Sequence, residues 1–210
     1  MALDELLDEH EQGERVRNWL KENALGLLGG LALGLALIGG GKWWMQRQHQ
    51  ERVAIGETYD RMVRAIESGD LETAKQEAAP LADTSYAPLA ALALAKGQLD
   101  AGDRDAAIAT LRAARSDDPG LAAVIRQRLA RLLVDAGQGE EAVSLLAGND
   151  DPGALEVRGD AHFALGRADE ARKDYEAALR KLDVAAPQRM LLELKLAQAG
   201  GTPDQAGTES

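Results

Sequence analysis

The residues best suited to catalysis or metal binding are few and lie far apart. The histidines are His10, His49 and His162, and none stands at metal-ligand spacing from another ligand. The sequence has no cysteine, which excludes disulfides and thiolate chemistry. It also has no GxSxG motif and no glycine-rich loop after a strand. We therefore predict that the protein is not an enzyme and uses no cofactor or metal, and that His162 packs in a core.

The composition favours an all-α protein that does not bind nucleic acid. Alanine, leucine, glutamate and arginine dominate, and aromatic residues make up 3% of the chain, so strands would lack the residues they prefer. The formal net charge is −11, and an acidic surface repels the phosphate backbone of nucleic acids. We therefore expect helices throughout and no nucleic-acid partner.

Residues 23–41 form an uncharged run that predicts a transmembrane helix. The 19 residues span about 28 Å as a helix, close to the hydrocarbon thickness of a bilayer. Lys21 and Lys42 bracket the run, and tryptophans stand where an interfacial aromatic belt would lie: Trp19, Trp43 and Trp44. The alternatives are a buried helix of a soluble domain and a cleaved signal peptide. A signal peptide is disfavoured because residues 1–22 hold seven acids against three bases.

The predicted span carries two further signals, and neither is decisive alone. Gly26, Gly30 and Gly34 fall four residues apart and could form a face on which another membrane helix packs closely. Seven glycines lie in the run, however, so chance also explains this spacing. Charge does not choose the orientation, because three basic residues flank each end: Arg15, Arg17 and Lys21 before the run, and Lys42, Arg47 and Arg52 after it.

The remainder of the chain contains an internal repeat. A glycine followed five residues later by an alanine recurs at spacings of 33, 35 and 29 residues: Gly69 and Ala74, Gly102 and Ala107, Gly137 and Ala142, Gly166 and Ala171. A tetratricopeptide repeat has about 34 residues. Glycine ends the first helix of each pair in a left-handed conformation, and the small alanine lets the two helices touch. This pattern predicts a tetratricopeptide-like α-solenoid.

The repeat predicts about four helix pairs and a capping helix. The pairs are expected at 55–68 and 71–82, 87–101 and 104–116, 121–136 and 139–147, 154–165 and 168–182. A last helix at 187–199 carries Met190, Leu191 and Leu194 on one side, the side expected to cover the final apolar face. The predicted organisation is an acidic cytoplasmic tail (1–22), a transmembrane helix (23–45), a stalk or helical extension (46–54), a repeat domain (55–199) and a disordered tail (200–210).

Helical arrays of this kind bind peptides or proteins on their concave face. Seven first-helix residues are candidates for that groove: Tyr59, Lys96, Gln127, Arg131, Glu156, Asp160 and Phe163. The alternative for each is an ordinary solvated or packed residue.

The order of several short segments resembles the YfgM family, the ancillary subunit of the SecYEG translocon. The resemblance rests on segments spread along nearly the whole chain: Val16-Arg-Asn-Trp-Leu-Lys-Glu-Asn23, Trp43-Trp44, Tyr59, Leu89–Gln98, Arg128-Leu-Ala-Arg131, Arg158-Gly-Asp-Ala161, and Pro187 with Met190 and Lys195-Leu196. It implies a bacterial inner-membrane protein with a single span, a cytoplasmic N-terminus and a periplasmic tetratricopeptide-like domain. It also implies association with SecYEG and with the membrane-anchored chaperone PpiD, and a role in handing exported client proteins onward.

Two other functions stay open at this point. In the first, the acidic tail captures a cytoplasmic response regulator of a stress pathway, with Leu3, Leu6, Leu7 and His10 on one helical face. The resemblance allows this role as well. In the second, the protein is an unrelated scaffold for envelope assembly, which the repeats alone would fit equally well.

Overall fold

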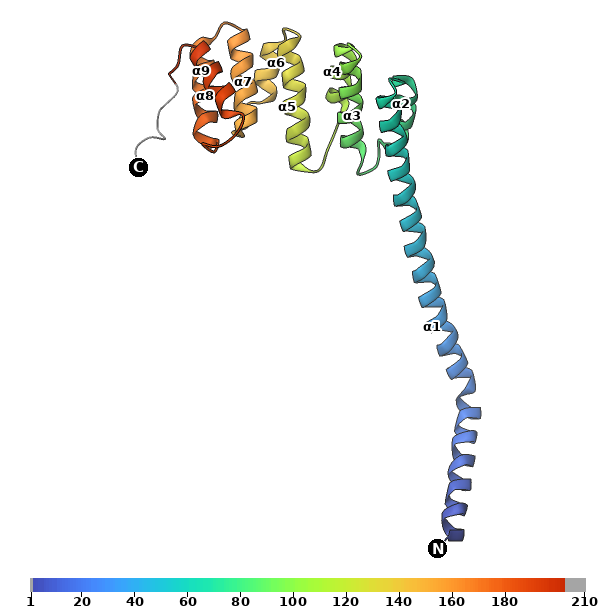
Figure 1. The fold of residues 1–210 in the computed structure, drawn as a ribbon. Helices are drawn as coiled ribbons and strands as arrows, with labels where there is room; N and C mark the ends of the chain where they lie inside the picture. Colours follow the sequence, from blue (N-terminus) through green and yellow to red (C-terminus); the bar gives the residue numbers. More distant parts are fainter. Residues whose placement is uncertain (1, 203–210) are drawn as a thin grey trace, which may run out of the picture. The chain divides into compact units, whose positions relative to one another are not determined.

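A computed structural model describes the backbone of residues 2–202, and the side chains of this range except those of residues 2–12 and 27. Residues 203–210 of the predicted tail, and the side chains of the predicted Leu3, Leu6, Leu7 and His10 face, lie outside this description. The described backbone is helical and contains no strand, so the all-α prediction is confirmed (Figure 1). The chain divides into two units, Met1–Ala54 and Ile55–Ser210.

The first helix, α1, covers Ala2–Glu67. Among the described residues no single helix combines the length and apolarity needed to cross a membrane. One bent pair, Gly13–Gly26 and Leu28–Glu67 at 48°, passes that test of length and composition together. Residues 46–54 are helical, as the helical-extension alternative predicted. A Cβ added at Gly26, Gly30 or Gly34 would meet no described atom within 4 Å, so their packing role stays a prediction.

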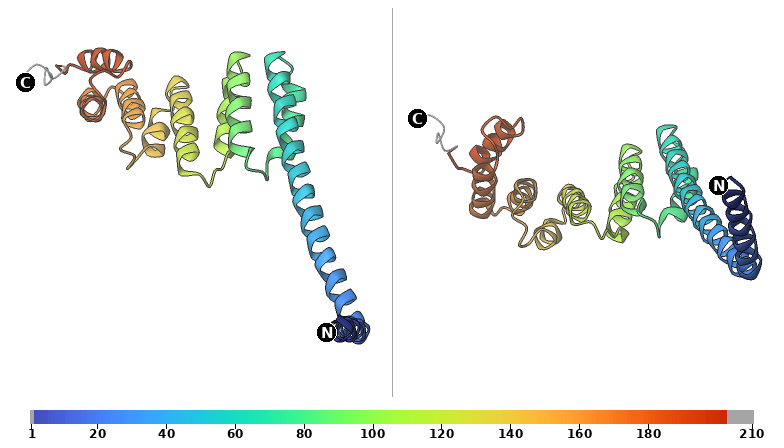
Figure 2. Two further views of the ribbon diagram at one scale, coloured as in Figure 1. Left: turned by 60° about the horizontal axis from the view of Figure 1, so that its bottom comes forward. Right: turned by 90° about the horizontal axis from the view of Figure 1, so that it is seen from below.

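The helix pairs predicted from the repeat are present in the second unit. The end of α1 is followed by α2 (Leu71–Ala78) and the short 3-10 helix η1 (Ala79–Leu81). The remaining helices are α3 (Ala87–Asp100), α4 (Arg104–Ala113), α5 (Pro119–Asp135), α6 (Gly139–Leu145), α7 (Pro152–Ala164), α8 (Ala168–Lys181) and α9 (Arg189–Gln198). From α3 to α7 the helices follow one another in chain order along the array (Figures 1 and 2).

Local sequence explains where these helices begin and end. Aspartates cap several N-termini, since the side chains of Asp70, Asp103 and Asp118 accept hydrogen bonds from backbone N–H groups of the first turn. The repeat glycines 69, 102, 137 and 166 all have φ between 74° and 84°. In each case the N–H of the next residue donates to a carbonyl five residues earlier, as in Asp103 to Gln98 at 2.8 Å. The predicted left-handed ends of the first helices are thereby confirmed.

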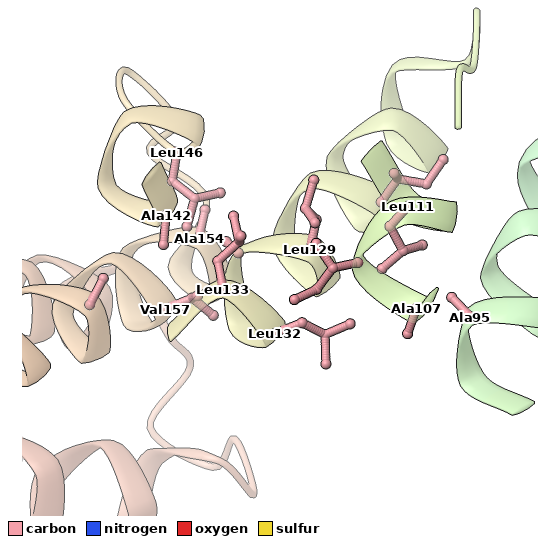
Figure 3. Close-up of a cluster of buried hydrophobic side chains, with 14 residues drawn as sticks. Ala95, Ala107, Leu111, Leu129, Leu132, Leu133, Ala142, Leu146, Ala154 and Val157 are labelled. Carbon is pink, nitrogen blue, oxygen red and sulfur yellow. The ribbon is translucent and has the colours of Figure 1, made fainter. Parts of the chain in front are cut away.

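Three clusters of buried apolar residues hold the second unit together. The N-terminal cluster joins α1, α2, η1 and α3, the middle cluster joins α3 to α7, and the C-terminal cluster joins α7, α8 and α9. Figure 3 shows the middle cluster, which includes Leu111 of α4, leucines of α5 and Leu146, the residue that follows α6. The repeat alanines 74, 107, 142 and 171 are completely buried in these clusters. Their small size therefore allows the helices of each pair to approach closely.

The capping helix α9 is present, but the prediction of its inner face is wrong. Met190, Leu191 and Leu194 are exposed, at 80%, 53% and 65% of their surface. Leu192 and Leu196 are buried in the C-terminal cluster instead. Each set of residues has the spacing of one helix face, because α9 has leucines on two of its faces. The interhelix turn before α9 decides which face lies inward, and the sequence pattern alone did not show this.

Candidate functional site

The main candidate site is a groove between the first helices of the second and third pairs. It has a volume of about 410 Å³. We call it the α3–α5 groove and define it by its lining residues: Leu92, Ala95, Lys96, Leu99, Leu111, Val124, Gln127, Arg128, Arg131, Leu132 and Asp135. All but Leu111 of α4 come from α3 and α5. First helices therefore line the groove, as is usual for the concave face of such arrays.

The helical period explains why these side chains share one surface. On α3, Leu92, Lys96 and Leu99 are separated by four and three residues, so they lie on one stripe. On α5, Val124 and Arg131 are seven residues apart, which again places them on one face. Leu99 is 41% exposed and Val124 is 36% exposed, whereas Leu132 is buried. The groove thus has an apolar floor that is accessible from outside.

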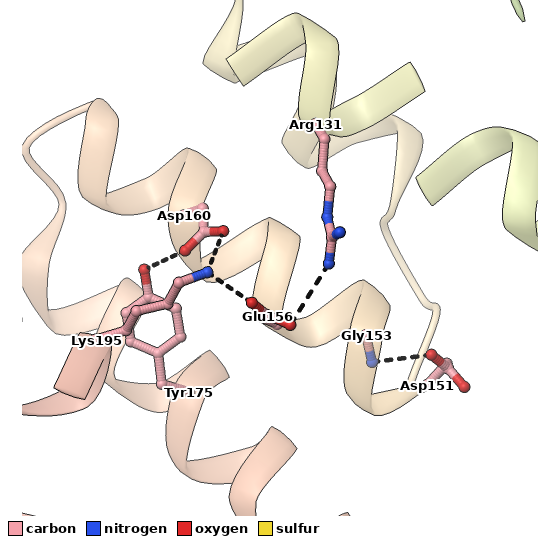
Figure 4. Close-up of polar contacts among 7 residues, drawn as sticks. All are labelled: Arg131, Asp151, Gly153, Glu156, Asp160, Tyr175 and Lys195. Atoms are coloured by element: carbon pink, nitrogen blue, oxygen red, sulfur yellow. Dashed lines mark hydrogen bonds and ion pairs between the residues drawn. The ribbon is translucent and has the colours of Figure 1, made fainter. Parts of the chain in front are cut away.

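A second hollow adjoins this groove. We call it the polar hollow, because most of its lining residues are charged or polar: Arg131, Asp135, Glu156, Asp160, Gln188 and Lys195, beside Val134, Val157 and Leu191. It has a volume of about 450 Å³ and shares Arg131 and Asp135 with the α3–α5 groove. Three of its lining side chains, Glu156, Asp160 and Lys195, form with the buried Tyr175 of α8 a set that we call the lysine–carboxylate cluster (Figure 4). Lys195 Nζ donates to Glu156 Oε1 at 2.6 Å and to Asp160 Oδ2 at 2.8 Å. The Tyr175 hydroxyl donates to Asp160 Oδ1 at 2.8 Å.

Two groups of the cluster, Lys195 and Tyr175, have pKa values above their ordinary values. Burial alone lowers the pKa of Lys195, but the hydrogen bonds and charges of Asp160 and Glu156 outweigh it, and the pKa is raised above its ordinary value. Burial raises the pKa of Tyr175 well above its ordinary value, and the charge of the adjacent Asp160 raises it further. At neutral pH the lysine is therefore charged and the phenol neutral. Each of the four side chains has a hydrogen-bond partner within the cluster, which indicates that the cluster links α7, α8 and α9 structurally.

Another ion pair, outside this cluster, joins α7 to α8. The Arg158 guanidinium donates two hydrogen bonds to the Asp174 carboxylate, and both side chains are largely buried. The hydrogen bond to Asp174 raises the pKa of Arg158 above its ordinary value. His162 Nε2 lies 3.8 Å from Asp174 Oδ2, and the His162 side chain is 13% exposed. The prediction that His162 is a packed residue is confirmed.

The predicted groove residues fall into three groups. Lys96, Gln127 and Arg131 line the α3–α5 groove. Glu156 and Asp160 line the polar hollow, and Arg131 Nη2 reaches Glu156 Oε2 at 3.6 Å. Tyr59 lies apart, packed on the N-terminal cluster with its ring centroid 5.2 Å from that of Tyr86. Phe163 lines neither hollow and is 38% exposed on α7. Whether any of these residues contacts a partner stays a prediction.

Sequence reasoning missed two kinds of residue at the site. Leu92, which is half-buried, and the exposed Leu99 and Val124 form the floor, and their helical spacing from Lys96 and Gln127 could have identified them. Lys195 completes the polar cluster from α9, 39 residues beyond Glu156. No local pattern connects these two positions, because their pairing depends on how α9 packs.

The side chains of this surface are suited to binding another molecule. No group of three or more metal-ligating side chains occurs in the part of the chain that the structure describes. The carboxylates of the polar hollow already accept hydrogen bonds from Lys195 and Tyr175. The α3–α5 groove instead offers exposed apolar surface and cations at the protein exterior, which suits contact with another polypeptide.

Comparisons with known proteins identify the family of the fold. The model of the tetratricopeptide repeat-like domain family matches residues 17–201. A curated relative from Escherichia coli (strain K12), named ancillary SecYEG translocon subunit, is 29% identical over 90% of this chain and 95% of its own. A relative of the same name from Haemophilus influenzae is 26% identical over 67% of this chain and 71% of its own. Both names confirm the resemblance to that family of subunits.

Solved structures support the fold alone. A crystal structure of tetratricopeptide-like repeats from a putative kinesin light chain of Podosopora anserina superposes with a TM-score of 0.51. Its sequence is 21% identical, and the match covers 70% of this chain and 84% of that one. The match is in keeping with the predicted tetratricopeptide-like solenoid, which the family model confirms.

Proposed function

The chain belongs to the tetratricopeptide repeat-like domain family, and we propose that it is a non-enzymatic protein that binds partners at the SecYEG translocon. The observation that carries the proposal is the α3–α5 groove, with Leu99 and Val124 exposed on its floor. Apolar side chains exposed in a concave surface indicate a contact site for another protein. The names of two relatives, one aligned over 90% of this chain, supply the translocon as the place of action.

The proposal extends to the membrane. We place the uncharged run at residues 23–41 in the bacterial inner membrane as a single span, the N-terminus in the cytoplasm and the repeat domain in the periplasm. Support comes from the aromatic and basic residues at both ends of the run and from the translocon named for the relatives. The repeat domain would then meet exported proteins as they leave SecYEG and help pass them to a PpiD-like chaperone.

Cysteine labelling tests the orientation directly, because the native chain has no cysteine. Asp8→Cys and Ser144→Cys are probed with a membrane-impermeant thiol reagent in cells whose inner membrane is intact. We expect labelling at Ser144→Cys, which is exposed on α6, and labelling of Asp8→Cys only after permeabilisation. Labelling of Asp8→Cys alone in intact cells would reverse the proposed orientation.

Site-specific photocrosslinking tests the binding role. A photoreactive amino acid replaces Leu99 on the groove floor, and a second variant carries it at the exposed Ser144 of α6 as a matched control. We expect SecYEG subunits, a PpiD-like chaperone or exported chains to be captured from position 99 and not from position 144. Absence of all of them at position 99, with normal membrane levels of the variant, would refute the proposed function.

A further inference from the structure

The charge of the α3–α5 groove differs in sign from that of the whole chain. Three cationic side chains, Lys96, Arg128 and Arg131, line the groove, against one acidic side chain, Asp135. The chain as a whole carries a net charge of −11. The side chains that line the groove therefore carry a net positive charge, although Asp100 and Glu156 beside it pair with Lys96 and Arg131. Exposed cations of this kind favour acidic partners over basic ones.

The three cations differ in how firmly they are held by this chain. Arg128 is exposed, and no carboxylate among the described residues forms an ion pair with it. Lys96 pairs with Asp100, but both side chains are more than half exposed, so solvent weakens the pair. Arg131 is 54% exposed and reaches Glu156 at 3.6 Å, longer than a good hydrogen bond. All three can therefore turn to an incoming carboxylate at low cost.

The apolar floor lies between these cations. Leu92 and Leu99 supply it from α3, and Val124 supplies it from α5. A ligand that had only carboxylates would leave the apolar floor in contact with water. A ligand that had only apolar side chains would form no ion pairs with the cations. Both features together specify apolar side chains flanked by carboxylates.

We propose that the α3–α5 groove binds an acidic, leucine-rich segment within a partner protein. The apolar side chains of the segment pack on Leu99 and Val124, and its Asp or Glu carboxylates pair with Lys96, Arg128 and Arg131. This inference rests on the proposed protein-binding function and adds the chemistry of the partner. It excludes basic segments, because their lysines and arginines would face the same three cations.

Peptide binding to the full chain in a non-ionic detergent tests the inference. The probe is a fluorescent peptide of leucine and glutamate, acetylated and amidated so that it has no terminal charge, and its twin carries lysine in place of glutamate. Fluorescence anisotropy should give at least roughly tenfold tighter binding of the glutamate peptide, with the advantage shrinking as salt is raised. Equal binding of the two peptides would overturn the inference.

Two variants distinguish peptide binding in the groove from peptide binding to the detergent and from an effect of the overall charge. Arg128→Glu should weaken binding of the glutamate peptide by on the order of fivefold to tenfold. Arg126→Glu makes the same change on the same helix, at an exposed side chain outside the groove, and should leave affinity within about twofold. Circular dichroism verifies that both variants stay folded. An equal loss in the two variants would contradict the assignment to the groove.

Failure of this inference is distinguishable from failure of the proposed function. If a photoreactive residue at position 99 captures SecYEG subunits at the same yield with and without Arg128→Glu, the function stands and the acidic-segment inference falls. If the glutamate peptide binds selectively but position 99 captures nothing in cells, the inference stands and the translocon function falls.

Discussion

At the scale of single residues, the contacts between α7 and α8 depend on charges that are removed from water. Asp174 is 7% exposed and accepts hydrogen bonds from Arg158, while His162 lies on the same carboxylate. A buried ion pair is not strongly stabilising by itself, but removing one partner leaves the other charge buried and unpaired. Asp174 therefore matters more than the many carboxylates on the surface of the same helix.

Replacing Asp174 tests this difference. Asp174→Ala should lower the free energy of unfolding by about 3 kcal/mol, because Arg158 keeps its charge without a partner. Asp169→Ala, which removes an exposed carboxylate paired with Arg172 on α8, should cost less than about 1 kcal/mol. Urea denaturation followed by circular dichroism measures both. Equal costs would show that the buried pair contributes no more than the exposed one.

The lysine–carboxylate cluster predicts loss of stability in alkali. The pKa values of Tyr175 and Lys195 are raised from ordinary values of 10.0 and 10.5, so the folded state holds these protons more tightly than the unfolded state. Stability is then fully present below about pH 10 and falls as pH rises further, because only the unfolded state releases the protons readily. Urea midpoints at pH 8 and pH 11 measure this, and Tyr175→Phe should show a smaller decrease than the native chain. A decrease of the same size in Tyr175→Phe would exclude the phenol as a cause.

Residue positions in the site were predictable where helical spacing alone decides them. Lys96, Gln127 and Arg131 share a groove because each lies on the inner stripe of a first helix. Tyr59 has the same register but lies on the packed N-terminal cluster, since the α2–α3 turn brings Tyr86 against its ring. Lys195 could not be found, because its contact with Glu156 and Asp160 depends on tertiary packing.

At the scale of helices, close approach within a pair depends on small residues. A Cβ added at Gly159 of α7 would lie 2.5 Å from Tyr175 Cε1 and 2.7 Å from Tyr175 Cδ1. Tyr175 is buried and hydrogen-bonded to Asp160, so the ring cannot yield easily. This contact explains why the fourth repeat combines a glycine on its first helix with a tyrosine on its second.

Gly159→Ala should therefore destabilise the protein by about 2 kcal/mol, as overpacking of a core contact does. Gly56→Ala is the matched control on α1, where the added Cβ would meet only Tyr86 Oη at 3.9 Å. Alanine is the better helix former, so Gly56→Ala should be neutral or stabilising by about 0.5 kcal/mol. Thermal unfolding compares the two, and a Gly159→Ala variant as stable as the native chain would mean that α7 and α8 separate without cost.

The two faces of α9 differ in their expected contribution to stability. Leu196→Ala removes a side chain that is 1% exposed in the C-terminal cluster and should cost about 3 kcal/mol. Leu194→Ala removes a side chain that is 65% exposed on the same helix and should change stability by less than about 0.5 kcal/mol. Chemical denaturation of the two variants decides between the observed face and the one that the sequence pattern had indicated. The reverse order of effects would restore the latter.

Helix positions were predicted closely, because the residues that end one helix and begin the next are clear in the sequence. The glycines at 69, 102, 137 and 166 end helices through a backbone conformation that other residues adopt only with strain. Asp70 and Asp103 then cap the helices that follow the first two of these glycines. The inner face of α9 was not predictable from its leucines, because leucines occupy both of its faces.

At the scale of the whole molecule, the helix pairs of the second unit are joined through clusters that each pair shares with the adjacent pairs. The helix α3 contributes to both the N-terminal and middle clusters, and α7 contributes to both the middle and C-terminal clusters. Solenoids with this arrangement have stabilities that add up from repeats and their interfaces. A local defect in one cluster should therefore reach only the adjacent cluster through the helix that they share.

Hydrogen exchange measured by mass spectrometry tests this locality. In Leu196→Ala, a defect of the C-terminal cluster, the amides of α8 and α9 should exchange faster, because local opening of these helices becomes easier. The amides of α3 and α4, which belong to the other two clusters, should keep their native rates. Leu133→Ala provides the comparison, since its side chain is fully buried in the middle cluster and its loss should speed exchange in α4 and α5 instead. If both variants accelerated exchange equally in every helix, the unit would unfold as one body, and partner binding in the α3–α5 groove would stabilise α9 as strongly as α3.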